Sequence, residues 1–331
     1  MSRDVTVVGD GIIGLAIANE ALDRGWAVTL VGEARPGAAS NAAAGMLAPF
    51  AEDEVGADAL APLMNASLEM YPAWLARVAP QVRLQSQGSL FLARDRDRLV
   101  QLRHEERRRR EGGAGSGARW LDRDALFDAE PALSPRMLGG FVVERERAVD
   151  PRRLRVALRE RFEALRGRAA VGGVTVRACG AWTDPWVRPV RGQALLLSGA
   201  PLLSHVIRTP DVYFVPRGEQ LYVGATSEEK AFDVRPTAGE TLELLREAFR
   251  LVPGIAELAL DEVLVGFRPA TRDHLPVIGH VAPEEIVASG HYRNGVLLAP
   301  ITARLVADLI ETGEVPALAR FDPRRFGGLK S

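Results

Sequence analysis

A glycine-rich turn near the N-terminus constrains the fold more than any other feature of the sequence. Residues 5–8 are rich in valine, which is typical of a buried strand. Gly9, Gly11 and Gly14 follow with the spacing G-x-G-x-x-G, which allows a tight turn, a close approach to a pyrophosphate and close helix–strand packing. The N–H groups that open the next helix then suit an anion. The stretch predicts a dinucleotide site, with an ordinary turn of another α/β protein as the alternative.

The next segments complete a βαβ unit. Residues 15–24 are predicted to form a helix that ends at Gly25, and residues 26–31 a second strand. An acid normally follows such a strand directly and holds the ribose hydroxyls of an adenosine. Here Gly32 takes that position, and the acid, Glu33, comes one residue later. Glu33 either turns toward the ribose or is a solvated loop acid.

A run of small residues, 35–49, follows the second strand and has no strong periodicity. Small side chains let a backbone lie close to a flat ligand, and Ser40 or Asn41 can cap a short helix that faces it. The alternative is a flexible linker rich in alanine and glycine, but Met46-Leu47 is too apolar for one.

Downstream, the patterns predict a mixed antiparallel region, and then a strand, a loop and a helix that return to the first unit. The basic segment 95–111 has interleaved glutamates, so a solvated helix face is favoured over a nucleic-acid patch. Two strands that meet at Gly218-Glu219 predict a hairpin. The expected helices are 57–79, 95–111, 151–166, 238–251 and 301–312, and the expected strands are 88–93, 139–143, 174–178, 194–197, 212–217, 221–226, 262–268 and 285–290.

Size and composition disfavour several classes of protein. With 331 residues, 47% of them hydrophobic, the chain can bury a large core in one large or two interleaved domains. The net charge of −1 disfavours nucleic acid as a partner. The single cysteine, Cys179, allows no disulfide framework or cysteine metal site and fits a reducing cytoplasm. The first strand begins too early for a signal peptide, and no apolar run reaches the roughly 18 residues of a membrane span. We expect a cytoplasmic protein.

Motifs spread over nearly the whole chain occur together, in this order, in one family. They are the glycine turn at 9–14, Ala42-Ala43-Ala44-Gly45-Met46-Leu47-Ala48-Pro49, Gly180-Ala181-Trp182, Arg191-Gly192-Gln193, residues 266–273 with 276–279, and residues 290–300. The last two are the most specific. Together they resemble the FAD-dependent D-amino-acid oxidase family, and within it the glycine oxidases of thiamine biosynthesis.

The resemblance implies an α/β (mixed α+β) fold of the D-amino-acid oxidase type. A Rossmann-like FAD-binding domain would be interleaved with a substrate-binding domain built on an antiparallel sheet. The resemblance also implies FAD held without a covalent bond, and a homo-oligomer. The FAD-binding domain would comprise residues 1–50, 140–192 and 264–331, and the substrate-binding domain residues 51–139 and 193–263.

The resemblance also assigns site residues. Arg268 stands at the family's carboxylate-binding position, where a planar guanidinium donates to both carboxylate oxygens better than lysine does. Tyr213 matches a tyrosine beside the substrate, and Arg293 would lie near flavin and substrate. The alternatives are a surface salt bridge for Arg268 and a core aromatic for Tyr213. His291 is favoured as a contact of the flavin loop over an acid or base. The predicted cofactor positions, which include the loop whose N–H groups stabilise charge at the flavin N1–C2=O end, are Gly9, Gly11, Ile12, Ile13, Gly14, Gly32, Glu33, Ser40, Ala44, Gly45, Met46, His291, Arg293, Asn294, Gly295, Val296 and Leu297.

The reaction implied by the resemblance is oxidative deamination of glycine or a related small amino acid. The imine hydrolyses to a 2-oxo acid and ammonia, O2 is reduced to hydrogen peroxide, and the reaction serves thiamine (thiazole) biosynthesis. Arg268 would hold the substrate carboxylate, and no dedicated base is required. The alternatives are a sarcosine or D-amino-acid oxidase or dehydrogenase, a NAD-linked dehydrogenase, and a remnant that binds its cofactor weakly.

One connection departs from the family pattern. Only residues 167–173 separate the helix at 151–166 from the next strand, which leaves room for about one strand of average length. The family has a strand and a three-stranded meander there that cover the adenine side of FAD. With Gly32 in the acid position, this predicts an incomplete adenosine site, in which Val171 or Val174 could replace the lost contact.

Overall fold

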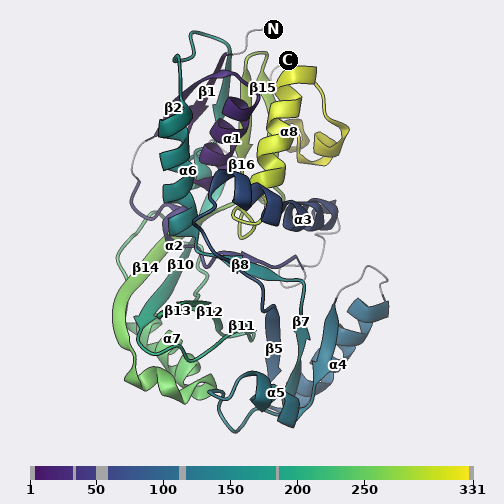
Figure 1. Ribbon diagram of the computed structural model, residues 1–331, viewed down its shortest axis with the longest axis vertical. Coiled ribbons are helices and arrows are strands. Elements are labelled where there is room, and N and C mark those ends of the chain that lie inside the picture. The colour runs from purple at the N-terminus through teal and green to yellow at the C-terminus, as the bar shows by residue number, and fades with distance from the viewer. Residues whose placement is uncertain (1–3, 33–34, 50–58, 112–116, 184–185, 328–331) are drawn as a thin grey trace.

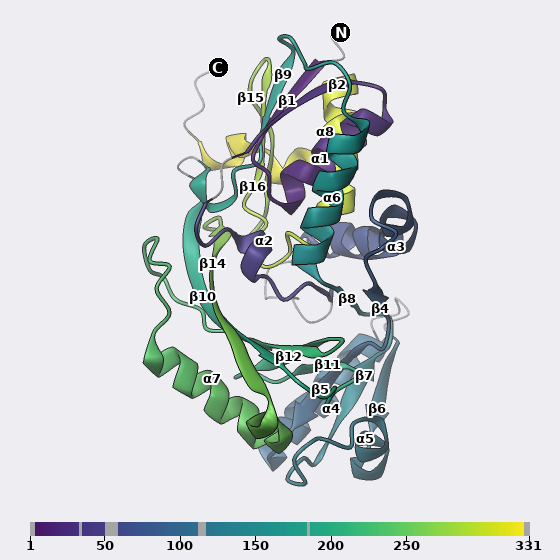
Figure 2. The same ribbon diagram turned by 60° about the vertical axis from the view of Figure 1, so that its left-hand side comes forward.

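The computed structural model describes residues 4–32, 35–49, 59–111, 117–183 and 186–327. Figure 1 shows a sheet covered by helices in the upper part of the view and a larger, curved sheet below it. Two long strands, β10 (Arg188–Ser198) and β14 (Ala259–Ala270), pair along the large sheet and extend from it toward the smaller one, as Figure 2 shows. The mixed α/β fold expected from the sequence is confirmed.

The valine-rich N-terminal segment lies inside a five-stranded sheet. β1 pairs in parallel with β2 on one side and β9 on the other, and β9 pairs in parallel with β16. β15 closes the edge in the antiparallel direction. Val5 and Val7 are fully buried, as expected for a parallel strand covered on both faces. In sheet order the strands are β15 (Val277–Ala282), β16 (Glu285–Ser289), β9 (Val174–Arg177), β1 (Asp4–Val8) and β2 (Ala27–Val31).

Long helices share one hydrophobic core with this sheet. The first begins at Ile12, earlier than the predicted residue 15, because Gly14 lies inside it and not before it. Asp150 caps the helix after it by accepting hydrogen bonds from the N–H groups of Arg152 and Arg153, as its position before Pro151 predicts. The helices are α1 (Ile12–Asp23), α3 (Ala61–Val78), α6 (Pro151–Leu165) and α8 (Ala299–Thr312).

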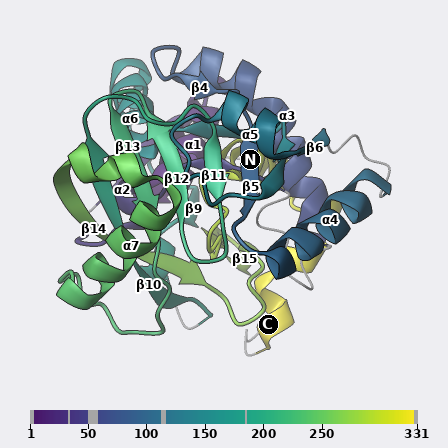
Figure 3. The same cartoon turned by 90° about the horizontal axis from the view of Figure 1, so that it is seen from below.

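The second sheet has eight strands and its own hydrophobic core. β12 and β13 form the predicted hairpin, with Arg217 opposite Gln220. The predicted helix at 238–251 is confirmed as α7 (Ala238–Leu251), which packs on the sheet, and Figure 3 shows it on the opposite side of the view from α4. In sheet order the strands are β14, β10, β13 (Gln220–Gly224), β12 (Tyr213–Arg217), β11 (Val206–Arg208), β5 (Ser89–Ala93), β7 (Gly139–Val143) and β6 (Ala118–Leu121).

Short elements join the two large sheets. β3 and β4 pair with β8 in a small antiparallel sheet, so the small-residue run lies beside the chain that enters α6. The predicted domain boundaries at 192/193 and 263/264 fall inside β10 and β14, and the domain division stays a prediction. In the described part of the chain, no helix is long and apolar enough to cross a membrane. Further elements of the described residues are α2 (Ala39–Ala42), β3 (Met46–Leu47), β4 (Leu84–Gln85), α4 (Arg96–Glu111), α5 (Arg123–Ala129), β8 (Arg147–Val149) and the 3₁₀ turns Gly180–Trp182, Pro253–Glu257, Pro316–Phe321 and Pro323–Phe326.

Candidate active site

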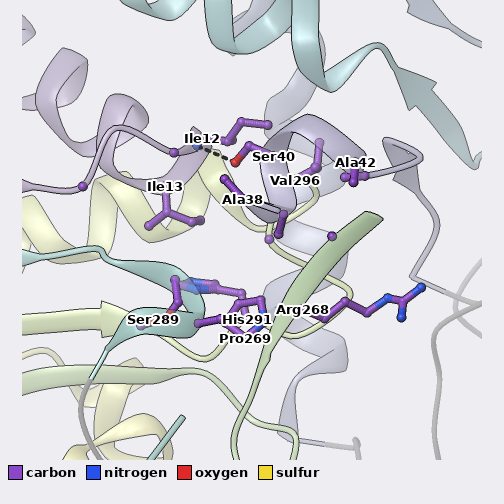
Figure 4. A pocket seen from close by; sticks show the side chains of 18 of the residues that line it. Ile12, Ile13, Ala38, Ser40, Ala42, Arg268, Pro269, Ser289, His291 and Val296 are labelled. Carbon is purple, nitrogen blue, oxygen red and sulfur yellow. Dashed lines mark hydrogen bonds between the residues drawn. The ribbon is translucent and has the colours of Figure 1, made fainter. Parts of the chain in front are cut away.

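A cavity of about 300 Å³ lies between the two large sheets. Its wall combines the carboxyl ends of β1 and β2, the small-residue run, the upper parts of β10 and β14, and the loop before α8. In Figure 4, Ile12 and Ser40 lie on one side, and Pro269 and His291 on the other. The predicted site residues that line the cavity are Gly9, Gly11, Ile12, Ile13, Gly32, Ser40, Ala44, Gly45, Met46, Tyr213, Arg268, His291, Arg293, Gly295 and Val296.

The glycine turn opens one end of this cavity. Gly9 has φ of +115°, and a Cβ there would lie 2.3 Å from the carbonyl oxygen of Ala178. The first hydrogen bond of α1 runs from the N–H of Leu15 to the carbonyl of Gly11, so the N–H groups before Leu15 have no intrahelical partner. Gly14 faces away from the cavity, since a Cβ there would lie 1.9 Å from the carbonyl oxygen of Gly9. It allows close packing and does not line the site.

Ser40 has a different role from the predicted one. Ser40 and Asn41 lie inside α2, whose N-cap is Ala38 and makes no side-chain hydrogen bond. The prediction that either residue caps this helix is therefore wrong. Instead, the N–H of Ile12 donates to the Ser40 hydroxyl oxygen at 3.1 Å. Because the first N–H groups of α1 lack intrahelical partners, this contact attaches α2 to the anion-binding end of α1.

The small-residue run is held in place along the cavity and is not a flexible linker. The Arg217 guanidinium donates to the carbonyls of Ala43 and Ala44 at 2.8 and 2.9 Å. Gly45 has φ of +81°, and a Cβ there would lie 1.8 Å from the carbonyl oxygen of Val149. This close approach brings the backbone of the run to the cavity wall, as the sequence predicts for a flat ligand.

Arg268 presents its guanidinium at the cavity wall, on β14. Its Nη1 donates to the carbonyl of Thr226 at 3.1 Å and to that of Arg191 at 3.5 Å. A Cβ at Gly192 would lie 2.5 Å from this Nη1, so a side chain there would displace the guanidinium from its present position. These carbonyl contacts are no surface salt bridge, which was the alternative to a ligand-binding role. The half-buried guanidinium is thus oriented by backbone atoms and keeps its positive charge for a ligand.

Two tyrosines form the wall next to Arg268. The rings of Tyr213 and Tyr222 stack with centroids 6.1 Å apart and an angle of 12°. The Tyr222 hydroxyl donates to the carbonyl of Ala42 at 2.8 Å. Burial, and then the neighbouring Tyr213, raise the pKa of Tyr222 well above its usual range, so this phenol stays protonated. Tyr213 is half-buried and lines the cavity, which agrees with a place beside a ligand better than with a core position.

The loop before α8 forms the opposite wall and is held by α3. The Tyr71 hydroxyl donates to the carbonyl of Val296 at 2.7 Å, and the Ser67 hydroxyl to that of Leu297 at 2.6 Å. No acceptor among the described residues takes the N–H of Gly295, Val296 or Leu297. Such N–H groups suit a developing negative charge. Asn294 and Leu297 do not themselves line the cavity.

His291 lies in the same loop and is buried. Its Nε2 lies 3.1 Å from the Thr302 hydroxyl. Burial lowers the pKa of His291 to about 3, so the imidazole is neutral near pH 7. A neutral, buried ring that is bonded to a threonine agrees with a structural contact in the loop and not with an acid.

The remaining predicted residues have different surroundings. Arg293 is exposed at the cavity rim, and its guanidinium carbon lies 5.3 Å from the ring centroid of Tyr292. Glu33 lies outside the described residues. Val174 pairs with Val5 at the start of β1, and Val171 donates its N–H to Asp4. Neither valine lines the cavity, because both lie at the opposite end of the strands.

Sequence reasoning missed several residues of the cavity wall. Tyr222 could have been found from the hairpin: with Arg217 opposite Gln220, Tyr222 pairs with Val215 and shares a face with Tyr213. Asp10 could have been found as a charge inside the glycine turn. The lining residues that were not predicted include Asp10, Arg35, Ala38, Cys179, Trp182, Tyr222 and Tyr292.

Comparisons with known proteins agree with this geometry. The profile of the family described as "DAO: FAD dependent oxidoreductase" matches residues 4–309. The chain is 32% identical to the glycine oxidase of Geobacillus kaustophilus, over 94% of this chain and 93% of that protein. The crystal structure of glycine oxidase from that organism matches with a TM-score of 0.86 and 30% identity, over 98% of this chain and 99% of that chain.

Two further relatives carry ThiO in their names. The chain is 31% identical to the putative thiamine biosynthesis oxidoreductase ThiO of Rhizobium etli, over 92% of this chain and 95% of that protein. It is 33% identical to the bifunctional protein ThiO/ThiG of Trichormus variabilis over 98% of this chain. The chain spans 55% of the length of that bifunctional protein.

The chain belongs to the DAO family of FAD dependent oxidoreductases. Its cofactor is therefore FAD, as the sequence predicts, and the alternative of a NAD-linked dehydrogenase is discarded. The residues present fit the pyrophosphate and the flavin of this group. The helix start and the glycine turn suit the pyrophosphate, and the N–H groups of the loop before α8 suit the electron-rich edge of the flavin.

Proposed function

We propose that the protein catalyses the oxidative deamination of glycine or a related small amino acid. The amino acid, O2 and water are converted to a 2-oxo acid, ammonia and hydrogen peroxide. The observation that carries the proposal is the oriented Arg268 guanidinium beside Tyr213 on the cavity wall. The names of the relatives, glycine oxidase and ThiO, support an amino acid as substrate and a role in thiamine biosynthesis.

The residues of this chain bind and orient the substrate in the proposed reaction. FAD, when bound, supplies the two-electron acceptor. The Arg268 guanidinium holds the substrate carboxylate in a bidentate pair, which fixes the direction of Cα and its amine. Tyr213 packs beside the bound substrate, and the neutral His291 neither takes nor gives a proton. The N–H groups of Gly295 and Val296, which line the cavity, would hold the flavin edge and favour negative charge there.

Anaerobic addition of substrate to the purified yellow protein tests this function. Glycine is expected to bleach the visible absorption band of the oxidised flavin, and air is expected to restore it with release of hydrogen peroxide. Bleaching by sarcosine or D-alanine alone would move the proposal to those substrates. Bleaching without peroxide on re-aeration indicates a dehydrogenase with another acceptor. If none of the three bleaches the flavin, amine oxidation is refuted and a weak cofactor-binding remnant is favoured.

Assembly is proposed from the family resemblance, and location from the single cysteine. We expect a homo-oligomer in the cytoplasm. Light scattering coupled to size-exclusion chromatography measures the mass of the particle and so tests the oligomeric state.

A further inference from the structure

An acidic residue lies inside the glycine turn and lines the cavity. Asp10 stands between Gly9 and Gly11 and lines the cavity. A Cβ at Gly32 would lie 2.5 Å from the Asp10 Cβ and 2.7 Å from its Cγ. The side chain of Asp10 therefore occupies the space that a side chain at position 32 would need. This space lies directly after β2, where an acid normally reaches the ribose of an adenosine.

Two arginines of α6 hold this carboxylate in place. Arg155 donates from Nη2 to Asp10 Oδ2 at 2.7 Å and from Nε to the Asp10 carbonyl at 3.0 Å. Arg159 also donates to Oδ2. Arg155 thus fixes both the side chain and the backbone of the turn. The two positive charges also offset the negative charge of an acid so close to a pyrophosphate site, where an isolated carboxylate would repel the ligand.

The short connection after α6 adds no polar group to this cluster. The N–H of Val171 donates to Asp4 Oδ2 at 3.0 Å, and the N–H of Ala170 to the Thr29 hydroxyl at 3.0 Å. These contacts hold the connection at the start of β1 and alongside β2, away from the glycine turn. The connection therefore does not reach the end of the cavity where Asp10 and Gly32 lie.

We propose that Asp10 accepts the hydrogen bonds of the adenosine ribose hydroxyls of FAD, in the role that Gly32 cannot perform. Arg155 and Arg159 position its carboxylate for these bonds. The exchange explains the missing acid after β2: position 32 is glycine because Asp10 fills its space, and the acid comes from the glycine turn. The inference concerns the cofactor and is independent of the amino-acid substrate.

Cofactor titration of the apo-protein tests the proposal, with FAD and FMN followed by quenching of flavin fluorescence. FMN lacks the adenosine. The substitution Asp10→Asn is expected to weaken FAD binding about tenfold or more and to leave FMN binding unchanged, because only FAD has the ribose that Asp10 would hold. The matched control is Asp23→Asn, which removes an α1 carboxylate that an α6 arginine, Arg161, also contacts at 2.6 Å, but outside the cavity. It is expected to bind both flavins as the native protein does.

FAD whose adenosine ribose lacks the 2′-hydroxyl gives a second test, which also works if the variant folds poorly. The native protein is expected to bind this analogue more weakly than FAD, and the difference is expected to be smaller in Asp10→Asn, which loses the charged acceptor. Unchanged or tighter FAD binding by Asp10→Asn would overturn the proposal. So would an equal loss of FAD and FMN affinity, since that result assigns Asp10 to the shape of the turn.

Discussion

At Arg268 the residue type predicts a carboxylate-binding group, and the neighbouring residues determine how that group is oriented. The sequence indicates a guanidinium at the end of a strand, which suits a carboxylate. The carbonyls of Thr226 and Arg191, which orient that guanidinium, come from elsewhere in the chain. Pairing of β10 with β14 places Gly192 next to the guanidinium, and this proximity depends on tertiary structure.

Removal of the Arg268 guanidinium should impair substrate binding and spare the cofactor. We expect Arg268→Ala to raise KM for the substrate about 100-fold, which corresponds to the loss of a charged bidentate pair of about 3 kcal/mol. The flavin absorption spectrum should not change. The matched control is Arg272→Ala, an exposed arginine of the next loop that does not line the cavity. An unchanged KM in Arg268→Ala contradicts the assigned role.

His291 makes stability depend on pH. Burial lowers its pKa to about 3 from 6.5, so below pH 6.5 the unfolded chain binds a proton that the native protein does not. The free energy of unfolding therefore falls as pH falls from 6.5 toward 3. Between pH 7 and pH 5, the native protein should lose about 2 kcal/mol more than His291→Gln does. Urea unfolding of the apo-proteins measures this difference. His104→Gln, on the exposed face of α4, should follow the native protein, and parallel curves for all three would refute the prediction.

At the scale of elements, the small-residue run is positioned by a glycine. Gly45 has a left-handed backbone, and a Cβ built on it would overlap a carbonyl oxygen of β8. Gly313, at the end of α8, has a similar φ of +79° but open space around it. Substitution at Gly313 therefore tests backbone strain alone, and substitution at Gly45 tests the same strain together with steric overlap.

Alanine at these two glycines should have unequal effects. Gly313→Ala should lower the free energy of unfolding by about 1 kcal/mol, the price of a left-handed alanine. Gly45→Ala should lower it by about 4 kcal/mol or more, because a Cβ 1.8 Å from the Val149 carbonyl oxygen forces β3 and β8 apart. Thermal and urea unfolding measure both losses. Equal losses would show that the overlap relaxes at little cost.

Elements with a strong periodic pattern were predictable, and short pairings were not. The helix at Ala238–Leu251 and the hairpin at Tyr213–Arg217 with Gln220–Gly224 follow from patterns local in sequence. β3 and β4 each have two residues and exist because both pair with β8. No pattern within two residues can indicate a partner so far along the chain.

At the scale of the whole molecule, FAD would contact both large sheets, since the cavity wall comes from both. Cofactor binding should therefore stabilise the two sheets together. FAD at 100 times its Kd is expected to raise the free energy of unfolding by about 2.7 kcal/mol. Urea unfolding followed by circular dichroism and by tryptophan fluorescence measures this gain. Both signals should shift together, and a shift confined to one of two transitions would contradict the shared site.

The sequence by itself determined the dinucleotide turn, most of the long elements and the residue types of the site, because strands, helices and turns are encoded by spacing within short segments. Tertiary structure alone decided that Tyr222 stacks on Tyr213, that Ser40 meets the start of α1 and that Asp10 fills the space beside Gly32. Each of these contacts joins separate segments. Their proximity depends on how the sheets and helices pack, which no local pattern specifies.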